Sequence, residues 1–480
     1  MKHFALKFPL TILCCAVGLF SSAAELIYPQ SNPYRTSSPV SYIAGAVKKG
    51  SALKINGNSV KIYPNGGFCF PVSLNFGENT FSYEEISADG TQKDVVKIIR
   101  NSPSVKKAVN PPVYKAFPAV AQAVVTTDGA PLRNGCSSNG ARLSHLPEGT
   151  FLFVEGEQNN FLKLAIKDSS NSFWIKKSDA KILYDVGNTP KAKVSDIDFS
   201  TDDKFDYVKI KTDFPVPFRI IEHGNALETT LYGTSLPDFV KTENLSANFS
   251  SDGFSNLKFS VCANSVLWGY EGLYEKNTFV LKIRKPPKVN KNCPLQGIVV
   301  ALDPGHGGHE KGTVGLTKIP EKTVNLDIAQ RLKTLLENSG ATVVMTRNHD
   351  KYVGLYERPA IAKKHDALIL LSIHANSVVD QNPLIKHGTS SFYYHPQAKA
   401  LATIIRDNSV KDLNLKDDGC RFASFVLTRE SNPISVLFET AYMPNPEEYT
   451  ALLSPEFRQK TALSLKKSLE EYLLKYGVLY

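Results

Sequence analysis

The chain has 480 residues, of which 42% are hydrophobic and 21% are charged, and its formal net charge is +10. This length exceeds what one hydrophobic core usually supports, so we expect roughly two to four domains, and the composition excludes a disordered protein. The positive charge suits an anionic surface such as a wall polymer or lipid headgroups, whereas no Lys/Arg run interleaved with aromatic residues points to nucleic acid.

The N-terminal residues 1–24 have the features of a secretory signal peptide. Lys2 and Lys7 are positively charged, residues 8–20 form a short apolar stretch, and small residues end the segment near Ala24. The alternative is an uncleaved membrane anchor, but the apolar stretch is shorter than the ~20 residues that span a bilayer. We therefore expect export across the inner membrane to the periplasm or cell envelope, without stable membrane insertion.

The cysteines beyond this segment are scattered and odd in number, and none forms a Cys-x-x-Cys pair. This pattern argues against a disulfide framework and against a cysteine-based zinc site. We expect small buried side chains with at most one or two bridges. The residues concerned are Cys69, Cys136, Cys262, Cys293 and Cys420.

Residues 27–101 have the pattern of a small β-sandwich. Short alternating strands are separated by Asn-Gly, Asn-Gly-Gly and Gly-Glu-Asn turns, and this spacing suits two packed sheets. In pattern, though in no specific motif, the segment resembles the bacterial Ig-like domains appended to exported enzymes. Residues 102–118 contain proline and lysine without periodicity and are predicted to be a linker.

Two further β modules are predicted after this linker. Residues 119–185 are similar to bacterial SH3-like repeats, with Arg133 and Trp174 at positions that such repeats share. Trp174 either lines a groove for wall peptide or glycan or caps a small core, and we favour the core. Residues 190–286 continue with paired strands as a third β accessory domain, and residues 284–294 form a second, basic linker.

The pattern changes near residue 297, and residues 297–478 are predicted to form one α/β domain. Strand-like apolar runs alternate with segments of helical periodicity, such as residues 321–340, where Val324, Ile328 and Leu332 fall on one helix face. Alternating β and α units imply a mostly parallel sheet with helices on both faces. The expected fold class is therefore multidomain, with all-β modules preceding an α/β domain.

Four polar side chains are expected at one edge of this sheet. His306 follows the run "IVVALD", His374 follows "ALILLSI", Glu439 follows "ISVLF", and Glu321 lies in the first turn of the long helix. Functional groups collect where the carboxyl ends of parallel strands meet. Two imidazoles and a carboxylate suit zinc with one position left for water, and a second carboxylate off the metal can act as a general base.

The stretch "ALDPGHGG" also raises the alternative of a phosphate-binding loop, because a glycine-rich turn follows a strand. It lacks Gly-Lys-Ser/Thr and the G-x-G-x-x-G spacing, so the histidine is better explained by a metal. Glu321 by itself is equally compatible with a first-turn acid that the helix dipole stabilises.

Six motifs in order carry a family resemblance. They are "ALDPGHGG", "PEKTVNLDIAQRLKTLLENSGATVVMTR", "LYERPAIA", "ALILLSIHAN", "GTSSFYY" and "SVLFETAYMPNPEE". Over about residues 297–478 the chain resembles the zinc-dependent N-acetylmuramoyl-L-alanine amidases of the amidase-3 class. The resemblance implies zinc held by His306, Glu321 and His374, with Glu439 as the catalytic carboxylate. It also implies hydrolysis of the amide between the lactyl group of N-acetylmuramic acid and L-alanine in peptidoglycan, in wall remodelling or daughter-cell separation.

The chain departs from the family pattern in two places. Residues 310–312 are Glu-Lys-Gly where the family commonly has Asp-x-Gly, and the segment between Tyr394 and Val426 is too short for the autoinhibitory helical insertion of regulated members. We therefore expect regulation by expression or through the N-terminal β modules, with a regulatory or divisome partner as one route.

Two alternative functions are a non-catalytic wall-binding or amidase-activating protein and a zinc stem-peptide endopeptidase. Retention of all four site residues argues against the first, and the lack of His-x-x-x-Asp and His-x-His pairs argues against the second. Around the site, Arg358 is expected to form an internal ion pair, whereas Asp303 either orients a ligand or caps the turn. The other histidines, His309, His387 and His395, are expected at the surface or around the site.

Overall fold

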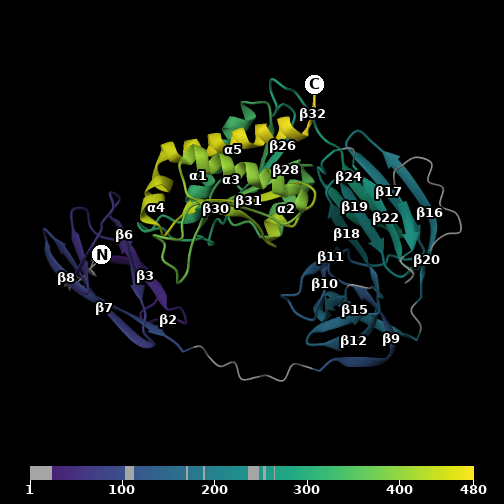
Figure 1. Ribbon diagram of the computed structural model, residues 1–480, viewed down its shortest axis with the longest axis horizontal. Coiled ribbons are helices and arrows are strands. Elements are labelled where there is room, and N and C mark those ends of the chain that lie inside the picture. Colours follow the sequence, from purple (N-terminus) through teal and green to yellow (C-terminus); the bar gives the residue numbers. More distant parts are fainter. Residues whose placement is uncertain are drawn as a thin grey trace, which may run out of the picture. The chain divides into compact units, whose positions relative to one another are not determined.

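The computed structural model shows two compact units (Figure 1). One contains Met1–Pro103 and Val379–Asn382, and the other contains Ser104–Val378 and Pro383–Tyr480. Residues 1–23, all but the end of the predicted signal peptide, lie outside the described residues. In the part of the chain that is described, no helix is long and apolar enough to cross a membrane. The structure describes residues 24–102, 113–168, 171–187, 190–235, 248–251, 256–263 and 265–480.

The first unit consists of two sheets around one small apolar core. Their strand orders are β1-β3-β6 and β2-β8-β7-β4-β5. Asn56 and Gly57 both have positive φ in the two-residue turn from β4 to β5, a turn that Asn-Gly favours. Within this unit, Asp380 accepts hydrogen bonds from the hydroxyls of Tyr28 and Thr36. The strands are β1 (Glu25–Tyr28), β2 (Tyr34–Thr36), β3 (Val40–Ala46), β4 (Ala52–Ile55), β5 (Asn58–Val60), β6 (Gly67–Ser73), β7 (Gly77–Ser87) and β8 (Gly90–Arg100).

The second unit begins with one antiparallel sheet, which we call the seven-stranded module. Its strand order is β11-β10-β14-β13-β12-β9-β15. Most of the linker predicted at residues 102–118 lies outside the described residues. The strands are β9 (Lys115–Val125), β10 (Ala130–Arg133), β11 (Arg142–Leu146), β12 (Phe151–Gln158), β13 (Phe161–Leu164), β14 (Trp174–Lys176) and β15 (Ala180–Gly187).

Two further sheets form what we call the paired-sheet module, with orders β20-β16-β17-β24-β23 and β18-β19-β22-β21. Its buried Phe259 and Phe279 belong to the same apolar cluster as Leu162 and Phe173 of the seven-stranded module. The two modules therefore share one core. The strands are β16 (Ala192–Thr201), β17 (Phe205–Thr212), β18 (Phe218–His223), β19 (Ala226–Leu231), β20 (Thr234–Ser235), β21 (Asn248–Ser251), β22 (Leu257–Cys262), β23 (Tyr270–Glu275) and β24 (Thr278–Arg284).

The chain ends in an α/β module whose sheet has the order β27-β26-β28-β31-β29-β30. The pairs β26–β27, β26–β28, β28–β31 and β29–β30 are parallel, whereas β29–β31 is antiparallel. The sheet is thus mostly parallel, with one reversal that the sequence did not predict. The strands are β26 (Val299–Pro304), β27 (Thr342–Met345), β28 (Ile369–Asn376), β29 (Thr389–Tyr393), β30 (Asp417–Phe422) and β31 (Ile434–Tyr442), and β25 (Lys288–Val289) pairs with β32 (Val478–Leu479) beside them.

Helices cover this sheet unequally. The long helices α1, α3 and α5 lie side by side on one face (Figure 1). On the other face, Ala362 of α2 packs with Ala301, Leu370 and Leu437 of the three central strands. This arrangement follows from the alternation of side chains along each strand, which directs every second residue to the same face. The helices are α1 (Glu321–Glu337), α2 (Glu357–Lys364), α3 (Lys399–Leu413), α4 (Pro446–Leu453) and α5 (Pro455–Tyr476).

Two elements of this module differ from the sequence expectation. β30 contains Asp417-Asp418-Gly419, residues that locally favour a turn, but it pairs in parallel with β29 at the edge of the sheet. α4 was not expected, although Asn445 caps it by accepting hydrogen bonds from the backbone N–H groups of the second and third helical residues. Tertiary pairing overrides local turn propensity in the first case.

All five cysteines beyond the predicted signal peptide are free thiols. Cys69 is buried, as expected. The expectation is wrong for Cys262, which is exposed, and the remaining three are partly exposed. Cysteine's apolar character predicts burial only where a strand face turns inward, and Cys262 stands at the end of β22.

Candidate metal centre

His306 stands in a sharp turn after β26. Its φ is +61°, a left-handed conformation that is uncommon for a residue other than glycine. Three hydrogen bonds fix the backbone around it. The Gly305 N–H donates to the Ile373 carbonyl, the Arg358 guanidinium donates to the His306 carbonyl at 2.9 Å, and Arg347 donates to the Gly305 carbonyl at 2.9 Å. The turn is therefore held in place by the protein around it.

Glu321 is the first residue of α1, and only 3% of its surface is exposed. Its Oε1 accepts hydrogen bonds from the Ala375 backbone N–H and the Asn325 side chain, both at 3.1 Å. Its Oε2 accepts a hydrogen bond from the Thr313 backbone N–H at 3.0 Å. The helix dipole also favours a carboxylate at this end. These contacts fix the orientation of the carboxylate.

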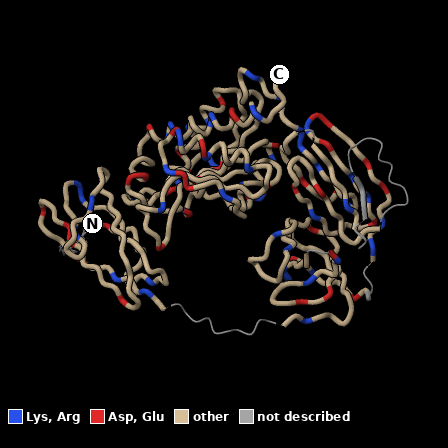
Figure 2. Tube along the Cα trace, viewed as in Figure 1, with Lys and Arg blue, Asp and Glu red and all other residues tan. Residues whose placement is uncertain are grey.

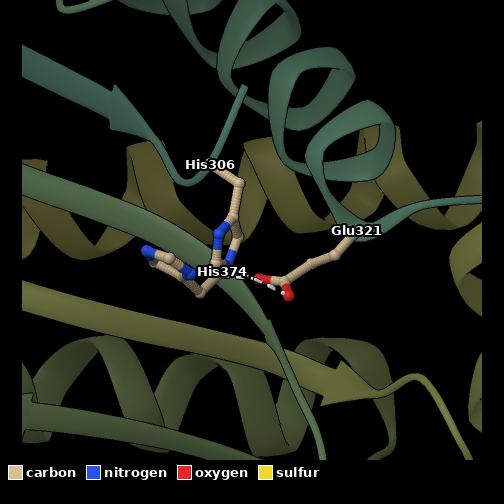
Figure 3. A group of neighbouring side chains, drawn as sticks. All are labelled: His306, Glu321 and His374. Atoms are coloured by element: carbon tan, nitrogen blue, oxygen red, sulfur yellow. Dashed lines mark hydrogen bonds and ion pairs between the residues drawn. The ribbon is translucent and has the colours of Figure 1, made fainter. Parts of the chain in front are cut away.

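His374 lies on β28 and completes a compact group of three side chains (Figure 3). Its Nδ1 is 3.0 Å from Oε1 of Glu321, and Nε2 of His306 is 3.2 Å from Oε2 of the same carboxylate. One ligand atom from each residue lies within 4.8 Å of the other two. The sequence predicted these three residues at one sheet edge, and the structure brings them together as a set that could hold a metal ion.

The charges of this group are strongly coupled. Burial by itself would raise the pKa of the Glu321 carboxyl, but the hydrogen bonds from His306 and His374 outweigh it and the pKa lies well below its usual range. Burial would likewise lower the pKa of His374, yet Glu321 raises it to about 9. The group thus combines an ionised carboxylate with a readily protonated imidazole. In a group of this kind, a bound cation can take the place of the proton.

Glu439 lies on β31 directly beside His374, with which it is in register. Its Oε2 is shielded from solvent and has no hydrogen-bond partner among the described residues. Burial raises the pKa of the Glu439 carboxyl to about 8, and the negative charge of Glu321 adds to this effect while His374 opposes it. A buried carboxyl with an unpartnered oxygen beside an imidazole can act as an acid–base group.

Two glycines make room for the group. A Cβ on Gly305 would lie 2.2 Å from the His374 ring. A Cβ on Gly312, whose φ is +68°, would lie 2.5 Å from Oε2 of Glu321 and 2.6 Å from the His306 ring. The sequence drew attention to Gly312 only as part of a departure from the family pattern. Its contact with both ligands was not predicted.

A buried ion pair lies beneath the group. Asp303 and Arg358 are 0% and 3% exposed and meet at 2.8 Å, which confirms the expected internal ion pair of Arg358. Asp303 also accepts hydrogen bonds from the hydroxyls of Thr346 and Ser372. Burial would raise the pKa of Asp303, but Arg358 and these hydroxyls hold it below its usual value. Asp303 therefore binds the residues that support the His306 turn and does not reach the metal ligands.

Sequence reasoning missed Arg347, which is 1% exposed. Besides Gly305, its guanidinium donates to the carbonyls of Pro304 and Lys322. It thereby joins the His306 turn to the first turn of α1, which carries Glu321. Its sequence signals were its place at the end of the motif "PEKTVNLDIAQRLKTLLENSGATVVMTR" and its position shortly after a strand, which is also common for a surface arginine.

The remaining predicted histidines lie apart from this group. His309 stacks on Tyr352 with ring centroids 4.3 Å apart. His387 contacts Glu448 at 2.9 Å, and His395 contacts Glu222 of the paired-sheet module at 3.2 Å. These positions agree with the expectation that none of the three is a ligand.

Comparison with known proteins gives the α/β module relatives. A family described as N-acetylmuramoyl-L-alanine amidase matches residues 300–471. The chain is 33% identical over 183 residues to the N-acetylmuramoyl-L-alanine amidase LytC of Bacillus subtilis (strain 168), covering 37% of this chain and 36% of that protein. It is 31% identical over 203 residues to the germination-specific N-acetylmuramoyl-L-alanine amidase of the same strain, covering 39% of this chain and 84% of that protein.

Among solved structures, the N-acetylmuramoyl-L-alanine amidase AmiC2 of Nostoc punctiforme shares 37% sequence identity, with 37% of this chain and 98% of that chain covered and a TM-score of 0.36. The chain spans about a third of the length of LytC and most of the length of the germination-specific relative. The family match extends from β26 to α5 and contains all four predicted site residues.

Proposed function

This chain belongs to the family of N-acetylmuramoyl-L-alanine amidases, and we propose on that basis that it hydrolyses the amide between the lactyl group of N-acetylmuramic acid and L-alanine in peptidoglycan. The observation that carries the proposal is the convergence of His306, Glu321 and His374, with the shielded carboxyl of Glu439 beside them. These are the groups that a metal-assisted amide hydrolysis needs.

We propose zinc as the metal. The donor set fits, because structural surveys of zinc sites give two imidazole nitrogens and one carboxylate as a common catalytic combination. One ligand atom from each of the three residues lies within 4.8 Å of the other two, so the three residues could hold one ion together. Zinc in such a site supplies Lewis-acid polarisation of the amide carbonyl and of a water molecule.

Glu439 acts as the general base and then the general acid in this proposal. Its unpartnered Oε2 accepts a proton from the attacking water, and the same proton passes to the departing L-alanine nitrogen. A nearby opposite charge lowers a carboxyl pKa. A cation held by the three residues would therefore lower the pKa of Glu439 from about 8 and favour its ionised form, which is the form a base needs.

The other residues of the site keep the ligands in position. Arg347 and Arg358 hold the backbone of the His306 turn, and the Thr313 and Ala375 N–H groups hold the carboxylate of Glu321. Such preorganisation matters because small displacements of catalytic groups lower the rate steeply.

For its place of action we propose the cell envelope. The signal peptide predicted at residues 1–24 would export the chain, and the substrate lies outside the inner membrane. The β modules are proposed to mediate contact with the wall or with a regulatory partner, since the α/β module alone contains the site.

Digestion of purified sacculi followed by mass spectrometry tests the function. We expect glycan strands with free lactyl carboxyls and stem peptides that are released intact. Peptides cut internally, or no products from a protein that contains stoichiometric zinc, would overturn the proposal.

Three variants separate the roles of the residues. Glu439→Gln should retain zinc by elemental analysis but release no product, whereas His374→Ala should lose both zinc and activity. Glu337→Gln, which alters a carboxylate on the solvent-exposed end of α1, serves as the control and should change neither. Activity of Glu439→Gln near the parent level would contradict the assigned base.

A further inference from the structure

One face of the seven-stranded module carries a row of basic and aromatic side chains. Arg142 on β11 is in register with Arg133 on β10, Arg133 is in register with Trp174 on β14, and Trp174 is in register with Lys163 on β13. Residues directly opposite one another in antiparallel strands point to the same side of the sheet. Tyr114 ends the row, with its ring edge-on to Trp174 and 5.3 Å from the Lys163 ammonium.

The negative charge of Asp179 acts on Arg133, but neither arginine of this row forms an ion pair among the described residues. Arg133 donates to the Gly140 carbonyl and Arg142 meets Nε2 of His145 at 3.2 Å. Lys163, by contrast, pairs with Glu155 at 2.7 Å. Like charges placed directly opposite in a sheet are destabilising. Repulsion between the two arginines therefore lowers the stability of the module when no anion is bound, and a bound anion would offset this repulsion.

The surroundings increase this unfavourable charge. Arg133 and Arg142 are partly buried, and burial together with the positive charge of Arg429 from the α/β module lowers the pKa of both guanidinium groups. Burial and Arg142 lower the pKa of His145 to about 3, so this imidazole stays neutral and adds no charge of its own. Three arginines from two modules of the same unit thus act on one place.

Two aromatic rings, one partly buried and one exposed, lie on the α/β side of this place. Tyr394, whose phenol interacts with Arg133 and Arg142, stacks on Phe422 with ring centroids 5.2 Å apart. Phe422 is 65% exposed. Lys and Arg positions are otherwise spread over the whole trace (Figure 2), so net charge alone would not single out this cluster. The cluster is distinguished by two facing arginines that have no ion-paired carboxylate and that lie near an accessible aromatic surface.

We propose that Arg133 and Arg142, with Arg429 beside them, bind the carboxylates of peptidoglycan stem peptides and so hold the enzyme on its substrate. The proposal rests on the proposed function for the identity of the polymer. Arginine suits this role because its planar guanidinium binds a carboxylate through two parallel hydrogen bonds, which a lysine ammonium does not do. The ligand's negative charge would also remove the repulsion between the facing arginines.

Binding of the full chain to sacculi tests the proposal. The parent carries Glu439→Gln so that the wall is not digested, and the test variant adds Arg133→Gln and Arg142→Gln. The matched control adds Lys176→Gln and Lys181→Gln, two exposed lysines of the same module, and so removes the same charge. In co-sedimentation at low salt, we expect about tenfold weaker binding for the arginine variant only. Equal binding by the arginine variant and the lysine control would overturn the proposal.

Chemical modification of the wall identifies the anion. Sacculi whose carboxyls have been converted to amides should lose parent binding and abolish the difference between the variants. A difference that persists on amidated sacculi, or that appears only with vesicles of anionic phospholipid, would overturn the assignment to wall carboxylates.

Two measurements distinguish binding by the arginines from a purely structural role and test the catalytic proposal independently. Because removal of facing like charges relieves repulsion, the arginine variant should unfold at the same or a higher temperature than its parent. A lower unfolding temperature would assign the arginines to structure and overturn the proposal. With native Glu439, the Lys176→Gln and Lys181→Gln control should hydrolyse a soluble muramyl-peptide at the parent rate. Absence of hydrolysis by the native chain would refute the amidase function, while the sacculus binding would still decide the arginine site.

Discussion

Replacement of Arg358 by methionine is the sharpest test of how the site is supported. The substitution keeps an unbranched apolar side chain but removes every donor, so the buried carboxylate of Asp303 loses its counter-charge at 2.8 Å. The Pro304 and His306 carbonyls also lose their hydrogen bonds from this side chain. Removal of one partner from a buried ion pair usually costs about 3–5 kcal/mol of unfolding free energy.

The pH sets an upper limit on this loss, because Asp303 can take up a proton in the variant. Protonating a carboxyl with an ordinary pKa near 3.9 costs about 4 kcal/mol at pH 7 and about 1.5 kcal/mol at pH 5. In the native protein the lowered pKa of Asp303 contributes stability above pH 3.9 that is lost only as the pH falls through the folded-state pKa. The native protein thus keeps this contribution at both pH values, and the difference from Arg358→Met should shrink from about 3–4 kcal/mol at pH 7 to about 1–2 kcal/mol at pH 5.

Urea unfolding followed by tryptophan fluorescence measures the difference. Trp268 packs on Tyr472 of α5 with ring centroids 5.0 Å apart, so in a Trp174→Phe background its emission reports on the α/β module. Lys333→Met is the control, since it removes only a solvent-exposed pair worth about 0.3–0.5 kcal/mol. A loss below about 1 kcal/mol at pH 7, or a difference that grows toward pH 5, would refute the reasoning.

Three smaller changes probe the same structure. Asn in place of Asp303 in the Arg358→Met background should recover much of the lost stability, since no buried charge then lacks a partner; no recovery in urea unfolding would contradict the charge argument. Gly312→Ala should weaken zinc binding about 10- to 100-fold in competition with a chelator, whereas Gly297→Ala, with a φ of +74° and open space around it, should not. Equal zinc affinity in the two alanine variants would show that the contact with the ligands is unimportant. The thiol reagent DTNB should label exposed thiols at once but leave Cys69 unmodified at pH 8 until unfolding, because burial raises the pKa of its thiol to about 12; labelling of Cys69 in the native protein would refute its burial.

The sequence predicted the four site residues because each stands where a strand or a helix begins or ends. His306 follows β26, Glu321 begins α1, and His374 and Glu439 lie in register near the ends of β28 and β31. Parallel strands bring such positions to one edge whatever the loops between them do. Periodicity and topology are therefore sufficient to predict that these four side chains meet at one edge, whereas their roles as ligands and base came only from the family resemblance.

The support of these ligands could not be predicted in the same way. Arg347 donates to four backbone carbonyls that lie in three separate stretches of the chain, and a Cβ on Gly312 would approach both His306 and Glu321. Both sets of contacts depend on how closely loops that are distant in sequence approach one another. The same holds for β30, where Asp417 and Gly419 indicate a turn locally but parallel pairing with β29 makes a strand. Local patterns carry no information on such approaches.

The paired-sheet module contacts the α/β module at a distance from the candidate site. Its Arg284 donates to Asn432, just before β31, and forms an ion pair with Asp366, just before β28. At about 3.3 Å per residue, these positions lie about 25 Å along the chain from Glu439 and His374. The module therefore holds the amino ends of the two strands whose far ends carry the chemistry. It can therefore alter the site's internal geometry only by shifting a packed central strand.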